Sequence, residues 1–152
     1  MILYKRKFLR ILGLSFLTVT LPFNSLLAAA KKIINSNLST QQKNIMFKKG
    51  TERPYSSELL NEKRKGFYHC ANCGNKLFAS NSKFNSGTGW PSFSEALPGA
   101  FKTKTDYSFG MERVEYHCAK CGAHHGHVFN DGPKESGKRF CSNGLCLIFK
   151  PE

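Results

Sequence analysis

The apolar residues of this chain fall into short runs rather than into long helical repeats. The runs are rich in aromatic and β-branched side chains, and Gly, Asn, Ser and Pro separate them, which is typical of short strands joined by turns. This pattern predicts a mainly β (α+β) fold, a small domain of antiparallel β-sheets. The runs lie at 66–70, 76–79, 114–118, 127–129 and 145–149.

Helical signals precede these strands. The sequence Ser-Thr-Gln-Gln at 39–42 has the order of a capping box, in which the serine caps the helix and the second glutamine returns the hydrogen bond. Apolar residues at 45–47 would give the helix one buried side, and Gly50 would end it. A second helical turn is expected at 58–60. We therefore expect short helices at the N-terminal side of the β domain.

The first 30 residues have a different character. A cationic stretch at 5–10 is followed by an apolar run at 11–23 and by small residues at 28–30. This order predicts a cleaved secretory signal peptide, because the apolar run is shorter than the ~20 residues of a membrane span. An uncleaved anchor or an organelle presequence is the alternative. We expect a signal peptide at 1–30, a linker at 31–37 and one domain at 38–152, exported to a bacterial periplasm.

The chain is strongly basic, with a formal net charge of +13 that falls to +9 once the four cations of the leader are removed. A basic surface can attract nucleic acid or anionic lipid. The cations are scattered, however, and lack a base-stacking signature. We therefore expect no nucleic-acid partner and no membrane contact after cleavage. A monomer is the expected state.

Four of the six cysteines occur in two nearly identical turns, Cys-Ala-Asn-Cys-Gly at 70–74 and Cys-Ala-Lys-Cys-Gly at 118–122. Each Cys-x-x-Cys places two thiolates on one tight turn, and two such turns supply the four ligands of a closed tetrahedral zinc site. Disulfides are the alternative, since an exported chain with six cysteines allows 15 pairings. The repeat favours structural Zn²⁺. Its expected ligands are Cys70, Cys73, Cys118 and Cys121.

Three further stretches carry candidate chemistry: Gly-Thr-Gly-Trp-Pro-Ser-Phe at 87–93, His-His-Gly-His-Val-Phe-Asn-Asp-Gly-Pro at 124–133, and Arg-Phe-Cys-Ser-Asn at 139–143. Together with the cysteine turns, and in this order, they resemble the B-type methionine-R-sulfoxide reductases over about residues 38–151. The resemblance implies an enzyme that repairs oxidised methionine, in proteins or free. It also implies a thioredoxin-like thiol as the reductant.

The residues themselves suggest how such a reaction would run. Cys141 would attack the sulfoxide sulfur, release methionine and become a sulfenic acid. Arg139 would lie on the same face of an extended segment and favour the thiolate. His124 and His127 are spaced i, i+3 and can face one pocket, where they would donate to the sulfoxide oxygen. For each histidine the alternative is a surface or core position without a catalytic role. By resemblance, Asp131 and Asn143 complete this hydrogen-bond network.

Two aromatic residues are expected to bind the substrate. The indole of Trp90 would give a polarizable apolar wall for the substrate S-methyl group, a role that the resemblance also implies. A core tryptophan is the alternative. Phe129 is assigned to substrate binding beside it, although packing also explains that ring.

One departure from the family pattern changes the expected chemistry. Many members have a second cysteine that resolves the sulfenic acid, whereas this chain has Thr88 at that position. Cys146 is the remaining candidate, but it lies in an apolar run and is expected to be a buried structural residue. Direct reduction by an external thiol is therefore expected. The competing interpretations are a basic zinc ribbon that binds nucleic acid or protein, and a disulfide-rich secreted binding module.

Overall fold

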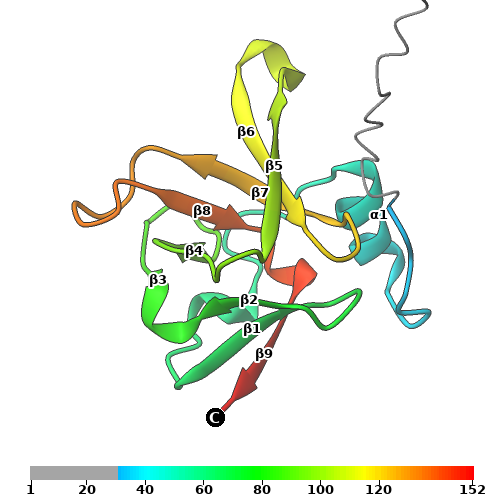
Figure 1. The fold of residues 1–152 in the computed structure, drawn as a ribbon, viewed down its shortest axis with the longest axis horizontal. Coiled ribbons are helices and arrows are strands. Elements are labelled where there is room, and N and C mark those ends of the chain that lie inside the picture. Colours follow the sequence, from blue (N-terminus) through cyan, green and yellow to red (C-terminus); the bar gives the residue numbers. More distant parts are fainter. Residues whose placement is uncertain (1–30) are drawn as a thin grey trace, which may run out of the picture.

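The structure is a computed structural model that describes residues 31–152, so the predicted signal peptide lies outside the described residues. Within them the chain forms two antiparallel β-sheets with one α-helix beside them (Figure 1). The predicted mainly β fold is confirmed. Among these residues no helix is long and apolar enough to cross a membrane.

The smaller sheet has the order β2-β1-β9 and the larger one the order β3-β4-β8-β7-β6-β5. Every neighbouring pair is antiparallel. The hairpin of β5 and β6 extends away from the rest of the domain (Figure 1). The strands are β1 (Gly66–Cys70), β2 (Lys76–Ala79), β3 (Lys83–Phe84), β4 (Ser92–Phe93), β5 (Phe101–Asp106), β6 (Arg113–Cys118), β7 (His124–Phe129), β8 (Arg139–Ser142) and β9 (Leu147–Pro151).

Helix α1 (Thr40–Lys48) begins as predicted. Ser39 caps it, and the backbone and side chain of Gln42 complete the capping box. The predicted end at Gly50 is wrong by one residue. Lys49 takes the left-handed conformation, with φ of 59°, and the Gly50 N–H bonds to the Asn44 carbonyl instead.

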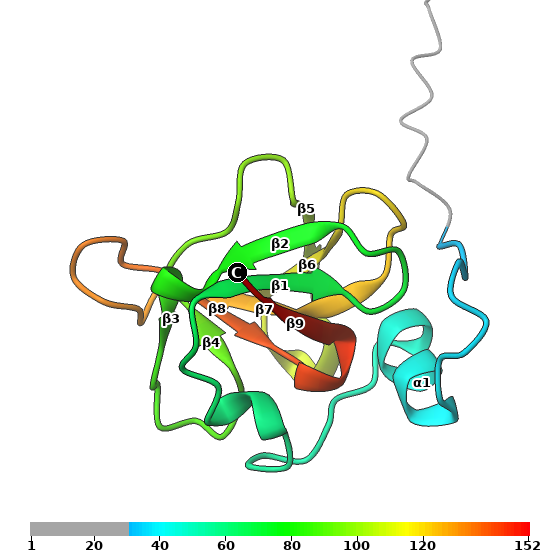
Figure 2. The same ribbon diagram turned by 90° about the horizontal axis from the view of Figure 1, so that it is seen from below.

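The remaining helical pieces are single 3₁₀ turns: η1 (Glu58–Leu60), as expected, η2 (Ser80–Ser82), η3 (Ser108–Gly110) and η4 (Gly144–Cys146). The strand expected at 145–149 therefore starts only at Leu147, because the chain turns at η4 after β8. Helix α1 contacts both η4 and β7 (Figure 2).

Aromatic side chains fill the space between the two sheets. Phe78 of β2 stacks on Phe93 of β4 with ring centroids 4.0 Å apart, and Tyr68 of β1 meets Phe93 edge-on at 4.8 Å. These three side chains are fully buried. Burying such a side chain contributes about 1.5–3 kcal/mol, so this layer holds the sheets against each other. The other face of the larger sheet is left to carry polar groups.

Candidate active site and metal centre

A cavity of about 140 Å³ opens on the larger sheet beside Trp90. It is small enough to take one side chain rather than a large ligand. It brings together five of the residues expected at the site, from loops and strands far apart in the chain. Its walls are Thr51, Trp90, Arg113, Gly126, His127, Phe129, Cys141 and Asn143.

Strand register explains why these side chains meet. In the antiparallel pair of β7 and β8, His127 is opposite Cys141 and Phe129 is opposite Arg139. Directly opposite residues point to the same face of a sheet. On the other side of β8, Ser92 of β4 is also opposite Cys141. One face of three adjacent strands thus carries the thiol, an imidazole and an aromatic ring.

A β-bulge in β7 decides where the histidines point. Between β6 and β7 the register steps from Tyr116–Gly126 to His117–His124, so His125 is an extra residue. His124 and His127 are three positions apart, which would place them on opposite faces of a regular strand. The bulge brings their rings onto the same face, with centroids 5.5 Å apart.

The bulge sends His125 the other way. Its ring is fully buried between Phe101 and Tyr116, and burial lowers its pKa to about 3. Gly126 next to it has no room for a side chain, because a Cβ there would lie 1.9 Å from the Cys141 carbonyl oxygen. The Gly in this motif is therefore required for β7 to approach β8.

Asp106, which the sequence analysis missed, holds His127. Its Oδ2 lies 2.8 Å from Nε2 of His127 and accepts a hydrogen bond from Arg113 at 2.8 Å. Hydrogen bonds from Ser108 and His127 keep the pKa of Asp106 well below its usual range. Burial lowers the pKa of His127, and the Asp106 carboxylate partly opposes this. The carboxylate fixes the ring so that Nδ1 is the nitrogen left for the cavity.

Glu115 holds His124 in a similar way. This fully buried carboxylate lies 3.0 Å from Nδ1 of His124, and Lys49 and Lys104 contact its other oxygen at 3.0 and 3.4 Å. Burial alone would raise its pKa, but hydrogen bonds from His124 and Lys49 hold the pKa far below the usual value. His124 is itself buried and does not line the cavity. Its ring lies beside that of His127, with centroids 5.5 Å apart.

Arg139 and Asp131 form a two-pronged ion pair. Nε and a terminal nitrogen of Arg139 each donate to Asp131 at 2.8 Å, and the guanidinium lies 4.5 Å from the Phe129 ring centre. Arg139 is two residues from Cys141 on β8, so the two side chains point to the same face of the sheet. Burial raises the pKa of the Cys141 thiol, while Arg139 and the Thr88 hydroxyl oppose that rise. Neither Arg139 nor Asp131 lines the cavity itself.

Glu52 joins the two loops that flank the cavity. Its carbonyl oxygen accepts a hydrogen bond from the Trp90 indole at 3.1 Å, and its N–H donates to the Asn143 side chain at 3.0 Å. Its buried carboxylate accepts from the N–H groups of Gly144 and Leu145. Glu52 therefore fixes Trp90 relative to the chain that follows Cys141.

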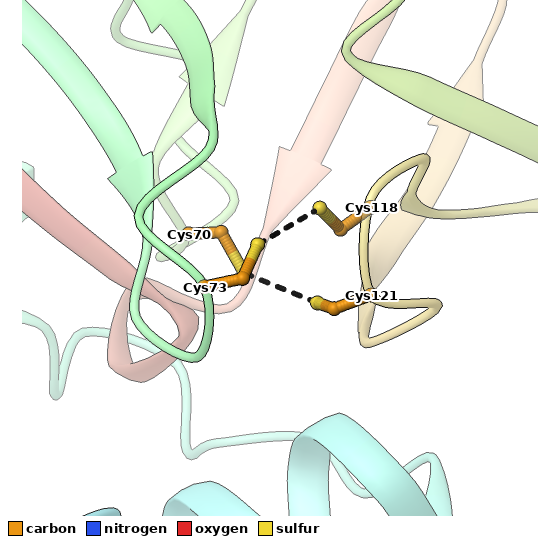
Figure 3. Close-up of side chains that lie close together, drawn as sticks. All are labelled: Cys70, Cys73, Cys118 and Cys121. Atoms are coloured by element: carbon orange, nitrogen blue, oxygen red, sulfur yellow. Dashed lines mark hydrogen bonds between the residues drawn. The ribbon is translucent and has the colours of Figure 1, made fainter. Parts of the chain in front are cut away.

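The four cysteines of the two turns meet at the ends of β1 and β6 (Figure 3). All four sulfurs lie within 4.8 Å of one another, and two pairs are 3.8 and 3.6 Å apart. A tetrahedron with Zn–S bonds of about 2.3 Å has edges of about 3.8 Å, so the sulfurs fit a Cys₄ zinc site. A disulfide needs sulfurs about 2.05 Å apart, and all six cysteines are free thiols. This geometry contradicts the disulfide-rich alternative.

The two cysteine turns have the same backbone. In each, the glycine N–H bonds to the first cysteine carbonyl at 2.8 Å, and both Gly74 and Gly122 have φ of 69°. This left-handed conformation favours glycine, which explains the repeated Gly. The segment 31–37, expected as a linker, hydrogen-bonds to both turns. Asn72 accepts from the N–H groups of Ile34 and Asn35, and Lys32 donates to the Cys121 carbonyl.

Comparison with known proteins agrees with this geometry. A family model described as the SelR domain matches residues 38–151. The peptide methionine sulfoxide reductase MsrB of Methanosarcina barkeri is 49% identical over 116 residues, which cover 76% of this chain and 82% of that protein. The MsrB of Variovorax paradoxus is 54% identical over 101 residues, covering 66% and 74%. The mouse mitochondrial methionine-R-sulfoxide reductase B3 is 43% identical over 78% of this chain and 47% of its own length.

The chain belongs to the SelR domain family. The resemblance to the B-type methionine-R-sulfoxide reductases is thereby confirmed, and with it the prediction of an enzyme rather than of a basic zinc ribbon. In this SelR domain the cavity beside Trp90 is the candidate active site, and the cysteine cluster is the candidate metal centre.

Proposed function

We propose that this protein reduces methionine-R-sulfoxide, in proteins or free, to methionine with Cys141 as the nucleophile. The observation that carries the proposal is the cavity in which Cys141, Trp90 and His127 form the walls. It offers a thiol for the sulfoxide sulfur, an apolar ring for the S-methyl group and a hydrogen-bond donor for the oxygen.

The reaction begins with the Cys141 thiolate. Its sulfur attacks the sulfoxide sulfur, and the oxygen takes up a proton. The oxygen then passes to Cys141, so methionine leaves and a sulfenic acid remains on the enzyme. Arg139 favours the thiolate, and Asp131 keeps Arg139 in place through its two hydrogen bonds. Asn143 lines the cavity with its side chain fixed between the Glu52 N–H and the His125 carbonyl.

His127 supplies the proton or hydrogen bond to the departing oxygen. Asp106 keeps its Nε2 occupied, so the other ring nitrogen serves the substrate. His124 and Glu115 act behind it by fixing the ring and the bulge. Trp90 faces the substrate methyl group. Phe129 is another wall residue, and the Arg139 guanidinium lies over its ring.

A thioredoxin-like dithiol closes the cycle in this proposal. Its two thiols reduce the sulfenic acid to the thiol, and a disulfide of the reductant and one water are formed. Thr88 stands where many relatives have a resolving cysteine, and Cys146 is fully buried and lies outside the cavity walls. The cysteine cluster would hold Zn²⁺, which keeps the two turns together and takes no part in the reaction. The leader at 1–30 supports export, and a monomer is the proposed state.

Turnover on separated sulfoxide diastereomers tests the function. With dithiothreitol as reductant, we expect reduction of methionine-R-sulfoxide and of R-sulfoxide peptides, and at least about 100-fold less reduction of the S form, because a fixed methyl wall and a fixed proton donor discriminate the two configurations. Equal reduction of both forms, or of neither, would contradict the proposal.

Replacing Asp106 by asparagine will lower kcat/KM about 10- to 100-fold at neutral pH. The carboxylate raises the pKa of His127 against the effect of burial, so its loss lowers that pKa further and less of the ring is protonated. Because activity falls as His127 loses its proton, the alkaline limb of the pH profile of kcat/KM should move to lower pH. Glu112→Gln is the control, because it removes an exposed charge from the same hairpin. An unshifted alkaline limb in Asp106→Asn would rule out this role.

A further inference from the structure

A second cavity, of about 640 Å³, shares Trp90 with the smaller cavity that Cys141 lines. The Glu52 carbonyl oxygen holds the indole N–H at 3.1 Å, so this ring is a fixed wall of both cavities. The smaller cavity takes one side chain, whereas the second falls within the ~300–1,000 Å³ that holds a whole small ligand. Its walls come from the chain at 55–63, from η2, from β3 and from the loop that joins β3 to β4.

The second cavity has both apolar and hydrogen-bonding walls. Leu60 and Phe84 supply apolar surface. The Asn61 side chain is exposed and has no hydrogen-bond partner in the described part of the chain. Asn85 uses only its side-chain oxygen, which accepts from the Gly87 N–H. Each amide can still donate and accept, as the backbone of an extended peptide requires, so these walls suit a stretch of polypeptide.

Two lysines give the second cavity a positive charge that its own carboxylate does not neutralise. Lys63 and Lys83 line it, and the one acidic residue among the described walls, Glu62, is paired with Arg64 at 2.6 Å. The Lys83 ammonium donates to the carbonyl oxygens of Leu60 and Glu62 at 2.9 and 3.1 Å. An ammonium has three protons to donate, so one remains, and no other described residue accepts it.

The position and charge of the second cavity indicate what occupies it. Free methionine sulfoxide has no neighbouring residue to place there, whereas a protein chain continues on both sides of an oxidised methionine. With that side chain in the smaller cavity, the adjacent residues meet the surface beside Trp90. Lys83 is half-buried, and burial lowers the pKa of its ammonium although the Glu62 carboxylate opposes this. A further anion stabilises such a partly desolvated cation, and an acidic side chain is the anion that a protein substrate brings.

We propose that the second cavity binds the polypeptide next to the oxidised methionine, and that Lys83 and Lys63 favour a segment with an acidic side chain there. This inference rests on the proposed function because it places the sulfoxide at Cys141. It makes protein segments, and acidic ones above all, the substrate class of this enzyme.

Steady-state kinetics on short peptides with blocked ends test the acidic preference in the full, metal-loaded protein. Each peptide has one central methionine-R-sulfoxide, a single glutamate is moved through the three positions on either side, and dithiothreitol is the reductant. At one or more of these positions glutamate should give a kcat/KM about fivefold above that of glutamine, as for a partly exposed ion pair. Added salt should reduce this ratio, because it screens the charges.

Two lysine variants connect the preference to the second cavity. Lys83→Met keeps the apolar stem without the charge and should bring the ratio of glutamate to glutamine peptides to about one. Lys63→Glu reverses a charge at the wall and should favour a lysine peptide over the glutamate peptide. Lys48→Gln, an exposed change on α1, is the control and should keep the wild-type ratio. Each ratio compares two peptides on the same variant, so a partly unfolded preparation does not alter it.

The outcomes separate this site from the reductase function itself. Equal kcat/KM for glutamate and glutamine at every position, or the wild-type ratio in both lysine variants, would overturn the proposal. Unchanged peptide ratios with a raised KM for a thioredoxin-type protein would also overturn it and assign the cavity to the reductant. Trp90 is the only tryptophan, so its fluorescence measures peptide binding to Cys141→Ser without turnover. Tighter binding of the glutamate peptide there would support the docking site even if the reductase function failed.

Discussion

Replacing Cys141 by serine will lower the reduction of methionine-R-sulfoxide at least about 10⁴-fold, because a serine hydroxyl is a far poorer nucleophile for sulfur and forms no sulfenic acid. The position of Cys141 in the structure is the reason to expect so large an effect from one substitution. Cys141 is the one cysteine among the residues that line the cavity, and it lies opposite His127 in the sheet. Turnover with dithiothreitol, measured by chromatography of the methionine formed, checks the result.

Cys146→Ser is the matched control. Burial raises the pKa of the Cys146 thiol well above its ordinary value, and the side chain has no exposed surface. We therefore expect Cys146→Ser to keep most of the activity. One equivalent of substrate without reductant should leave a sulfenic acid on Cys141 of the wild-type enzyme, which dimedone traps for mass spectrometry. Substantial turnover by Cys141→Ser would defeat the assignment, and a Cys141–Cys146 disulfide would replace direct reduction with a resolving step.

Local signals in the sequence predicted local structure well. The capping box at Ser39 depends on residues three apart, and the two cysteine turns each depend on five consecutive residues. The strands with aromatic side chains facing the core, such as β1 and β2, were likewise predicted at their observed bounds. The sequence indicated no strand at β3, β4 or β5. β3 and β4 have only two residues each, and β5 is polar after Phe101, so none has an apolar alternation to detect.

The groups that hold the site in place were harder to find than the site itself. Asp106 is 21 residues from His127, and Glu52 is 91 residues from Asn143, so only the folded sheets bring them together. No spacing rule points to such residues. The sequence does place His124 and His127 near each other, but their common face depends on a bulge that is set by pairing with β6. Sequence motifs can identify the residues expected to react. The residues that hold them in place are found only once the pairing of the strands is known.

Removing the metal will destabilise the domain as a whole rather than the active site alone. Cys70 and Cys73 lie at the end of β1 in the smaller sheet, while Cys118 and Cys121 lie at the end of β6 in the larger one. A metal held by all four therefore links the two sheets beside their aromatic core. Without it, four buried or half-buried thiols remain close together with no compensating charge.

Structural zinc contributes about 10–16 kcal/mol of apparent binding free energy in zinc-finger peptides, which is comparable to the total stability of a small domain. Cys118→Ser should therefore lose stoichiometric zinc and lower the Tm by about 15 °C or more. Circular dichroism melts, with zinc measured by mass spectrometry after gel filtration, check both. Cys141→Ser is the control, since it makes the same change outside the cysteine cluster and should keep the metal and the Tm while losing activity. A Cys118→Ser protein that melts like the wild type would mean that packing between the sheets, and not the metal, holds them together.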